Sequence, residues 1–180
     1  LNSYLSLAGT SKNIILRDNL EEIISDFEIT SFNRAPTKFN YNDLKILNSK
    51  YIQKLDFEEL KLRFSNHKFK IEKKVWKLIK SNISSLNQLK DWEDVFYGKL
   101  EDIKVDKNLK KEFLKYLPDG EFSDETWEKW TNNLKENLDM KKAKIFKSLR
   151  EALTGYTAGP EMSALIIILG KEKVLERLNN

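Results

Sequence analysis

Helix-periodic spacing of apolar residues runs through almost the whole chain, and no other feature restricts the fold as strongly. Apolar side chains recur every three or four residues instead of alternating, as at Leu109, Phe113 and Leu117. Only six glycines and three prolines interrupt the 180 residues. The pattern therefore predicts an all-α fold built from many short helices.

Several helix ends can be predicted from capping residues. Asp18 and Asp56 each precede a glutamate by three residues, which is the spacing of a capping box. Gly155 suits the left-handed residue that closes a helix. Pro160 suits the first position of the following helix, where the missing N–H costs nothing.

Composition excludes several classes of protein. An apolar content of 40% places the chain among globular proteins. The absence of cysteine excludes disulfides, a thiolate nucleophile and cysteine-based zinc sites, and it fits the reducing cytoplasm, where we expect the protein to be. The longest apolar run, residues 164–169, is far shorter than the roughly 20 residues of a membrane span, so we expect no membrane association.

Catalytic chemistry is not evident in the sequence. The single histidine, His67, cannot form a histidine-based metal site alone, and it has no serine or cysteine partner at a recognisable spacing. Residues 155–159 lack the glycine pattern of a phosphate-binding loop. We therefore predict no catalytic residue and no metal site. The four tryptophans stand at helical spacing, which favours the core over base stacking.

Positive charge is concentrated in the last two-thirds of the chain. Residues 1–60 hold seven basic and nine acidic residues, which leaves 25 basic and 19 acidic residues for the remainder. Two patches stand out, residues 61–80 and 139–150, and such localised patches suit a polyanion such as RNA. The predicted phosphate-binding residues are Lys70, Lys73, Lys74, Lys77, Lys80, Lys141, Lys144 and Lys147. The alternative is that these lysines are only solvated helix faces.

Motifs at both ends of the chain resemble one family. The segment LREALTG at residues 149–155, followed by Gly159-Pro160-Glu161 and by LGKEK at 169–173, is similar to the C-terminal signature of bacterial glutamyl-tRNA synthetases. Residues 31–52 resemble the stretch that follows the catalytic signature loop of that family, and residues 1–9 resemble the helix just beyond that loop. The resemblance spans the chain, although residues 61–137 match only in helical pattern.

This resemblance implies a class I ligase that uses ATP and Mg²⁺ to activate glutamate and then transfers it to tRNA. Neither nucleotide-binding signature is present, so we expect a C-terminal fragment with no cofactor and no ligase activity of its own, whose catalytic domain belongs to the same polypeptide. The implied fold is a multi-helix anticodon-binding region preceded by a small, mostly helical stem-contact segment. The implied divisions are residues 1–56 for stem contact, and 57–100 and 101–180 for two helical anticodon-binding subdomains.

The resemblance also implies which residues read the anticodon. These positions are Arg150, Gly159, Pro160 and Met162, where an arginine plane can stack on a base beside an apolar shelf. Asn82 stands near the place where some relatives carry an arginine that rejects the glutamine anticodon. The implied partner is therefore the glutamate tRNA, and acceptance of the glutamine tRNA stays open.

Two other functions are compatible with the residues alone. A helical protein-interaction module would bind through an exposed apolar patch and ignore tRNA. A general RNA binder would bind unrelated hairpins as tightly as the glutamate tRNA. For the tRNA-binding function we expect a monomer.

Overall fold

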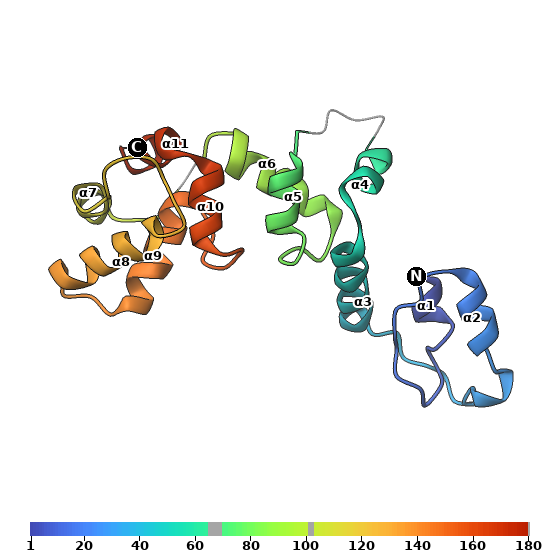
Figure 1. Ribbon diagram of the computed structural model, residues 1–180. Helices are drawn as coiled ribbons and strands as arrows, with labels where there is room; N and C mark the ends of the chain where they lie inside the picture. Colours follow the sequence, from blue (N-terminus) through green and yellow to red (C-terminus); the bar gives the residue numbers. More distant parts are fainter. Residues whose placement is uncertain (65–69, 101–102, 180) are drawn as a thin grey trace. The chain divides into compact units, whose positions relative to one another are not determined.

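The fold is that of a computed structural model, which describes residues 1–64, 70–100 and 103–179 (Figure 1). His67 lies outside these residues. The α-helices are α1 (Asn2–Leu5), α2 (Leu20–Asp26), α3 (Tyr41–Lys54), α4 (Phe57–Arg63), α5 (Lys73–Ile79), α6 (Leu89–Tyr97), α7 (Lys107–Lys115), α8 (Thr126–Asn137), α9 (Lys142–Thr154), α10 (Met162–Leu169) and α11 (Lys171–Asn179). Short 3-10 turns lie at Ile29–Ser31 and Leu86–Gln88. In the described segments the sole strand-like pairing is an isolated bridge, so the predicted all-α class is confirmed.

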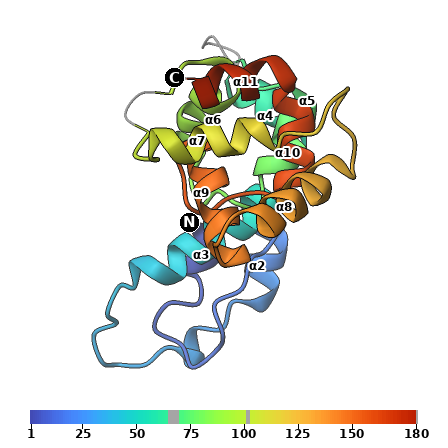
Figure 2. The same cartoon turned by 90° about the vertical axis from the view of Figure 1, so that its left-hand side faces the viewer.

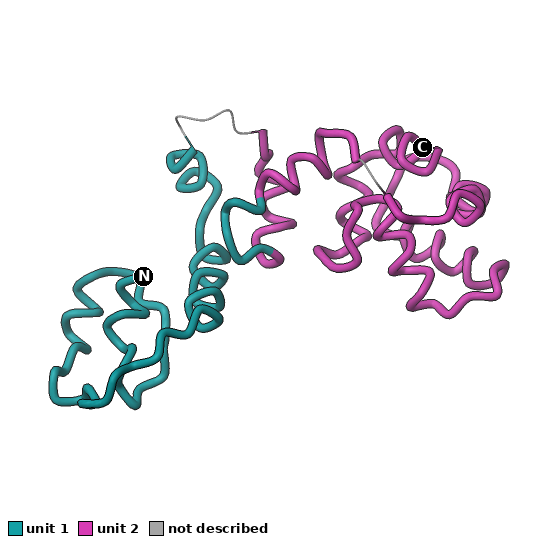
Figure 3. The backbone as a smooth tube through the Cα atoms, turned by 180° about the vertical axis from the view of Figure 1, so that it is seen from behind, with its two compact units in different colours: residues 1–65, 83–88 teal, residues 66–82, 89–180 magenta. Residues whose placement is uncertain are grey.

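The chain divides into two compact units (Figure 3). Unit 1 comprises residues 1–65 and 83–88, and unit 2 comprises residues 66–82 and 89–180. The three-part division expected from the sequence, with limits at residues 56 and 100, stays a prediction.

Unit 1 holds its N-terminal helix against the irregular segment that precedes α3. The Tyr4 ring is buried and meets Phe39 edge-on at 5.2 Å between centroids, while its hydroxyl accepts a hydrogen bond of 2.8 Å from the Asn40 amide. Gly9 has a φ of 92°, and a Cβ there would lie 2.5 Å from the Thr37 hydroxyl oxygen. Only glycine therefore fits this close approach.

The segment 83–88 returns to α3 within unit 1. The Asn48 side-chain amide donates a hydrogen bond of 2.6 Å to the Ser84 carbonyl, and Ile83 is fully buried. These contacts explain why a stretch between α5 and α6 belongs to the first unit.

In the described part of unit 2, helices α5 to α11 pack around an apolar core. In both views α8 and α9 run side by side, and α10 and α11 pack on the same group (Figures 1 and 2). Among the side chains with no exposed surface are Phe113, Trp130, Leu149 and Leu165. The Trp130 indole N–H donates a hydrogen bond of 2.9 Å to the Phe113 carbonyl, which satisfies the one polar atom of that ring.

Capping residues mark where the helices begin and end, and the structure confirms some of the predicted caps and contradicts others. The capping box at Asp56 is confirmed, because its carboxylate accepts from the Glu59 amide at 2.8 Å and the reciprocal bond is present. The prediction for Asp18 is wrong. The N-cap of α2 is Asn19, and the Asp18 carboxylate instead accepts a hydrogen bond of 2.6 Å from Lys54.

At the end of α9, Gly155 has a φ of 74° and is the predicted left-handed cap. The prediction for Pro160 is wrong, since α10 begins two residues later at Met162 and its N-cap residue is Glu161. Pro160 lies in the loop instead, where its carbonyl accepts a hydrogen bond from Arg150.

Candidate nucleic-acid interface

The loop between α9 and α10 is anchored by Arg150. Its Nη1 donates a hydrogen bond of 2.8 Å to the Pro160 carbonyl. At Gly159, whose φ is 154°, a Cβ would stand 3.0 Å from the Trp92 ring and 3.2 Å from Arg150 Nη1. The Met162 side chain is buried at the start of α10. The structure therefore brings four of the predicted anticodon-reading residues together in one small region of unit 2.

The Arg150 guanidinium is half-buried, and loss of solvent lowers its pKa from the ordinary value. The guanidinium remains charged near neutral pH, because the ordinary pKa of an arginine side chain lies far above 7. Within the described residues it has no carboxylate partner. A partly desolvated, unpaired guanidinium strengthens its electrostatic contacts with any anion or base edge that reaches it.

An open groove of about 600 Å³ lies beside this loop, between α8, α9 and the start of α10. We call it the α8–α9 groove. Its lining residues are Trp127, Ala143, Phe146, Lys147, Arg150, Thr157, Glu161 and Met162. The groove thus joins the predicted reader Arg150 to Lys147, one of the predicted phosphate contacts.

Aromatic side chains on the groove wall were not predicted. Trp127 is only partly buried, whereas Trp76, Trp92 and Trp130 are in the core with exposures of 1%, 6% and 0%. The assignment of tryptophans to the core is therefore confirmed for three of the four. Trp127 pairs with Phe146 at 5.4 Å between ring centroids. Sequence spacing could not separate Trp127 from Trp130, since both fit the periodicity of α8.

The eight predicted phosphate-binding lysines all belong to unit 2. Five lie on α5 or beside it, and three lie at the N-cap or in the first half of α9; all but the half-buried Lys80 are exposed. Lys74 alone in this set forms an ion pair, at 3.3 Å with Glu72, among the residues that the structure describes. The other ammonium groups are available to an anion.

Asn82 is exposed just after the end of α5, and its side-chain amide donates to the Ser81 hydroxyl at 3.1 Å. It does not line the α8–α9 groove. The structure therefore does not bring Asn82 into the cluster around Arg150.

A buried arginine that was not predicted to matter secures this region. Arg177 of α11 is 4% exposed, and its two terminal nitrogens donate to the carbonyls of Leu153 and Val95. These carbonyls lie near the C-terminal ends of α9 and α6, where the helix dipole is negative and favours a cation. Burial nevertheless lowers the pKa of Arg177 to about 10. Arg177 thus fixes the end of the helix that carries Arg150.

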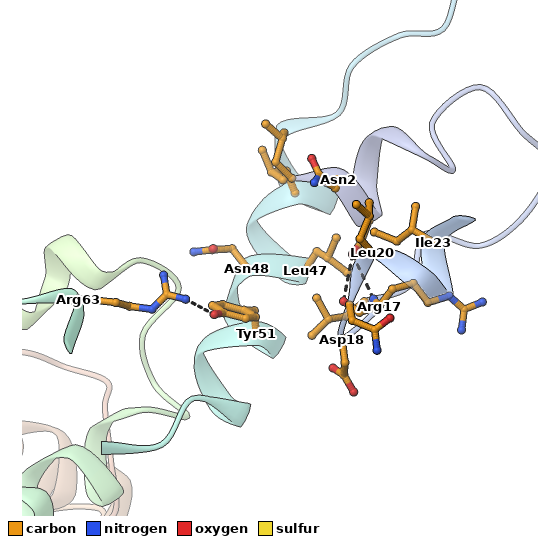
Figure 4. Close-up of a pocket in the computed structure, with 14 residues that line it drawn as sticks. Asn2, Arg17, Asp18, Leu20, Ile23, Leu47, Asn48, Tyr51 and Arg63 are labelled. Atoms are coloured by element: carbon orange, nitrogen blue, oxygen red, sulfur yellow. Dashed lines mark hydrogen bonds between the residues drawn. The ribbon is translucent and has the colours of Figure 1, made fainter. Parts of the chain in front are cut away.

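Unit 1 contains a separate open cavity of about 450 Å³ (Figure 4). Its wall includes Asn2, Asn48 and Arg17, together with Tyr51, whose hydroxyl accepts a hydrogen bond from Arg63. Across the described chain there is no group of three or more histidine, cysteine, aspartate or glutamate side chains able to hold a metal ion. In the same described part, no helix is long and apolar enough to cross a membrane.

The sequence of unit 2, which contains the cluster around Arg150, matches a known domain family. A family model described as "Anticodon binding domain" matches residues 47–180. The chain belongs to this anticodon-binding domain family. The match includes every residue of the cluster around Arg150 and both lysine groups. It therefore favours anticodon binding over the alternative of a protein-interaction module.

Full-length relatives extend the likeness over the whole chain. The chain is 35% identical over 180 residues to glutamate–tRNA ligase 1 of Ehrlichia ruminantium, strain Welgevonden, covering 99% of this chain and 40% of that protein. It is 35% identical over 182 residues to glutamate–tRNA ligase 2 of Hyphomonas neptunium, again covering 40% of the relative. The chain therefore spans about two-fifths of the length of these relatives, and the predicted likeness to glutamyl-tRNA synthetases is confirmed.

Solved structures show the same fold. A crystal structure of a glutamate tRNA ligase from Elizabethkingia meningosepticum, in complex with its amino acid, matches with a TM-score of 0.70 at 19% identity. The alignment covers 99% of this chain and 39% of that one. At this identity the match supports the all-helical architecture alone.

Proposed function

We propose that the chain is the tRNA-binding and anticodon-reading part of a glutamate–tRNA ligase. The observation that carries the proposal is the cluster at the end of α9, where Arg150 is unpaired and held against the Pro160 carbonyl in a domain of the anticodon-binding family. The substrate class is the anticodon arm of a tRNA.

Arg150 is the proposed base reader. One guanidinium nitrogen is occupied by the Pro160 carbonyl, which sets the direction of the planar group. The rest of the fork can stack on an unstacked base or donate to its edge. Gly159 keeps the loop close to Trp92, and Met162 supplies an apolar surface next to it.

The lysines are the proposed phosphate contacts. Three exposed lysines lie at the N-cap and in the first two turns of α9 and carry no ion pair with described residues: Lys141, Lys144 and Lys147. Lys147 also lines the groove beside Arg150. Lysines at this spacing can follow the phosphates of a single-stranded loop.

Salt dependence tests the phosphate contacts. Each neutralised phosphate adds about −0.7 to −0.9 to the slope of log affinity against log salt, and we expect a slope with a magnitude of about 3–5. Replacing Lys141, Lys144 and Lys147 together by alanine should reduce that magnitude by about 2. Lys129→Ala is the control, because Lys129 is already paired with Glu125. Salt-independent binding, or no binding of tRNA at low salt, would contradict the assignment.

Anticodon-swapped tRNA tests Arg150. Arg150→Ala should weaken binding of the glutamate tRNA by about 1–3 kcal/mol and leave a variant with another anticodon almost unaffected. Equal weakening of both tRNAs would make Arg150 a phosphate contact only. The same titration with a glutamine tRNA measures whether this second tRNA is also bound. We expect binding if Asn82, near the place where some relatives carry an arginine, does not reject the glutamine anticodon.

The remaining properties are proposed from the relatives. Residues 1–56 would contact the inner side of the tRNA, and residues 57–100 and 101–180 would form the anticodon-binding subdomains. Ligation of glutamate with ATP and Mg²⁺ would occur on the catalytic domain of the same polypeptide, to which we assign no residue here. We propose a monomeric, cytoplasmic enzyme.

A further inference from the structure

We propose that Trp92 of α6 is a positioning residue, which sets the direction of the Arg150 guanidinium from behind the loop between α9 and α10. Trp92 acts through Gly159 and the Pro160 carbonyl and touches no RNA itself. The inference rests on the proposed function, because the property that Trp92 controls is the choice between one anticodon and another.

Trp92 and Arg150 meet at one point of this loop. A Cβ on Gly159 would stand 3.0 Å from Cη2 of the Trp92 ring and 3.2 Å from Arg150 Nη1, so both side chains lie against the same stretch of backbone. The same Nη1 donates a hydrogen bond of 2.8 Å to the carbonyl of the next residue, Pro160. The indole ring therefore limits how far the loop can move toward α6, and with the loop it holds the carbonyl that orients the guanidinium.

The burial of Trp92 makes it a support and not a stacking surface. Its side chain is only 6% exposed. Its ring centre lies 5.8 Å from that of Tyr156 in the loop and 6.2 Å from that of Phe96 in the last turn of α6. A base needs an exposed ring face to stack on. Trp92 can therefore influence the RNA only through the loop that it supports.

The helix that carries this ring is itself held in place by α11. In the last turn of α6, the Val95 carbonyl accepts a hydrogen bond from Arg177, and the Phe96 carbonyl accepts one of 3.0 Å from Lys173. Arg177 also donates to the Leu153 carbonyl near the end of α9. Cations are favoured at these helix ends by the helix dipole. Helices α6 and α9 are thus tied to the same third helix, which gives the ring a fixed base.

This arrangement separates selectivity from affinity. Reading a base edge depends on the orientation of the planar arginine fork, and a recognition group must stay within about 0.5 Å and 10–20° of its productive geometry. Attraction between ammonium groups and phosphates depends on charge and distance and tolerates such a displacement. Loss of the support by Trp92 should therefore lower the preference for one anticodon and leave the salt-dependent part of binding unchanged.

The positioning role is tested with the 180-residue chain and two fluorescently labelled hairpins, which copy the anticodon arm of the glutamate tRNA with its own and with an exchanged anticodon. Trp92→Phe withdraws the ring edge that lies against Gly159 and keeps an aromatic ring in the core. The preference for the hairpin with its own anticodon should fall about 2- to 30-fold, while the slope of log affinity against log salt stays the same. Trp76→Phe, at a buried tryptophan of α5, is the matched control and should keep the preference.

A double-mutant cycle distinguishes positioning from a merely structural contribution. Because Trp92 acts through Arg150, adding Trp92→Phe to Arg150→Ala should lower the preference no further. Circular dichroism melts check that each variant is folded. If Trp92→Phe does not fold, Gly159→Ala tests the same contact from the side of the loop, since its methyl group would press on the Trp92 ring, and it enters the same cycle.

The outcomes separate the two proposals. A wild-type chain that binds neither hairpin, or binds both equally, overturns the proposed function together with the role of Trp92. If the wild-type chain prefers its own anticodon and Trp92→Phe keeps that preference as fully as Trp76→Phe does, only the role of Trp92 is overturned. An effect of Trp92→Phe that persists in the Arg150→Ala background also overturns it, because the ring would then act by another route.

Discussion

Arg177 offers the sharpest test of the forces that hold the reading end of unit 2 in place. Its guanidinium is buried without a carboxylate among the described residues, and it bridges the last turns of α9 and α6 through Leu153 and Val95. Replacing it by methionine keeps an unbranched side chain of similar length and removes only the charged fork. Lysine keeps the charge but presents a single nitrogen.

The magnitude follows from two opposing contributions. Hydrogen bonds from a charged donor contribute about 1.5–3 kcal/mol each, so the two bonds stabilise the fold by about 3–6 kcal/mol. Burial lowers the pKa of Arg177 from its ordinary value to about 10, which corresponds to about 3 kcal/mol against the charged form. Arg177→Met loses the stabilisation from the two hydrogen bonds but also removes the penalty of burying the charge, which leaves a net loss of about 0–3 kcal/mol. Arg177→Lys retains the buried charge with at most one of the bonds, so we expect a loss of about 2–4 kcal/mol.

Urea unfolding followed by tryptophan fluorescence measures these losses, because all four tryptophans lie in unit 2. The folded pKa of Arg177 lies below its unfolded value, so the penalty on the charged form is constant at low pH and is relieved only above about 10. The difference between Arg177→Met and wild type should therefore be the same at pH 6 and pH 8. Lys129→Met, which removes an exposed cation of α8, should change stability by less than about 0.5 kcal/mol.

Two results would refute the reasoning about Arg177. If Arg177→Lys is as stable as wild type, the fork that joins two carbonyls is not what stabilises the helix ends. If Arg177→Met is more stable than wild type, the cost of burying the guanidinium exceeds what its hydrogen bonds return.

Three further predictions concern stability, each measured by urea unfolding with far-ultraviolet circular dichroism. Asp56→Ala removes the carboxylate that accepts from the Glu59 amide, while the backbone N–H of residue 56 can still donate to the Glu59 side chain, and it should cost about 1 kcal/mol; Asp18→Ala is a control that costs less because Asp18 caps no helix. Gly155→Ala should cost about 1 kcal/mol from its φ of 74° alone, since nothing stands within 4 Å of the added Cβ; a neutral effect would mean that the helix end relaxes. Trp130→Phe should cost about 1–3 kcal/mol because the Phe113 carbonyl loses its donor, and a smaller loss would show that water replaces it.

Helix periodicity and capping chemistry predicted the class of fold and many of its helices, because both act over a few neighbouring residues. The misplaced start of α2 shows where local information fails. Asp18 and Asn19 are adjacent, and each precedes a glutamate by three residues. In the structure Asn19 caps the helix, and the Asp18 carboxylate binds Lys54, which is 36 residues away in the sequence.

The candidate site, like the fold, could be predicted only in part from the sequence. The motif around Arg150 and the loop at 159–162 could be identified from the resemblance, and the structure gathers these residues in one place. The partial exposure of Trp127 could not be predicted, because Trp127 and Trp130 share the same periodic pattern and only the packing of α9 and α10 distinguishes them. The role of Arg177 was equally hidden, since its acceptors are backbone carbonyls that have no signature in the sequence.

The sequence by itself determined that the chain is helical, where some of its helices begin or end, where the positive charge gathers and which family it resembles. These properties depend on side-chain chemistry and on spacings of three to seven residues. Tertiary structure alone decided which of these side chains meet. It holds Arg150 against the Pro160 carbonyl, leaves Trp127 and Glu161 facing a common groove and buries Arg177 between two helix ends. Contacts between residues far apart in the chain depend on how whole helices pack, which short-range patterns do not specify.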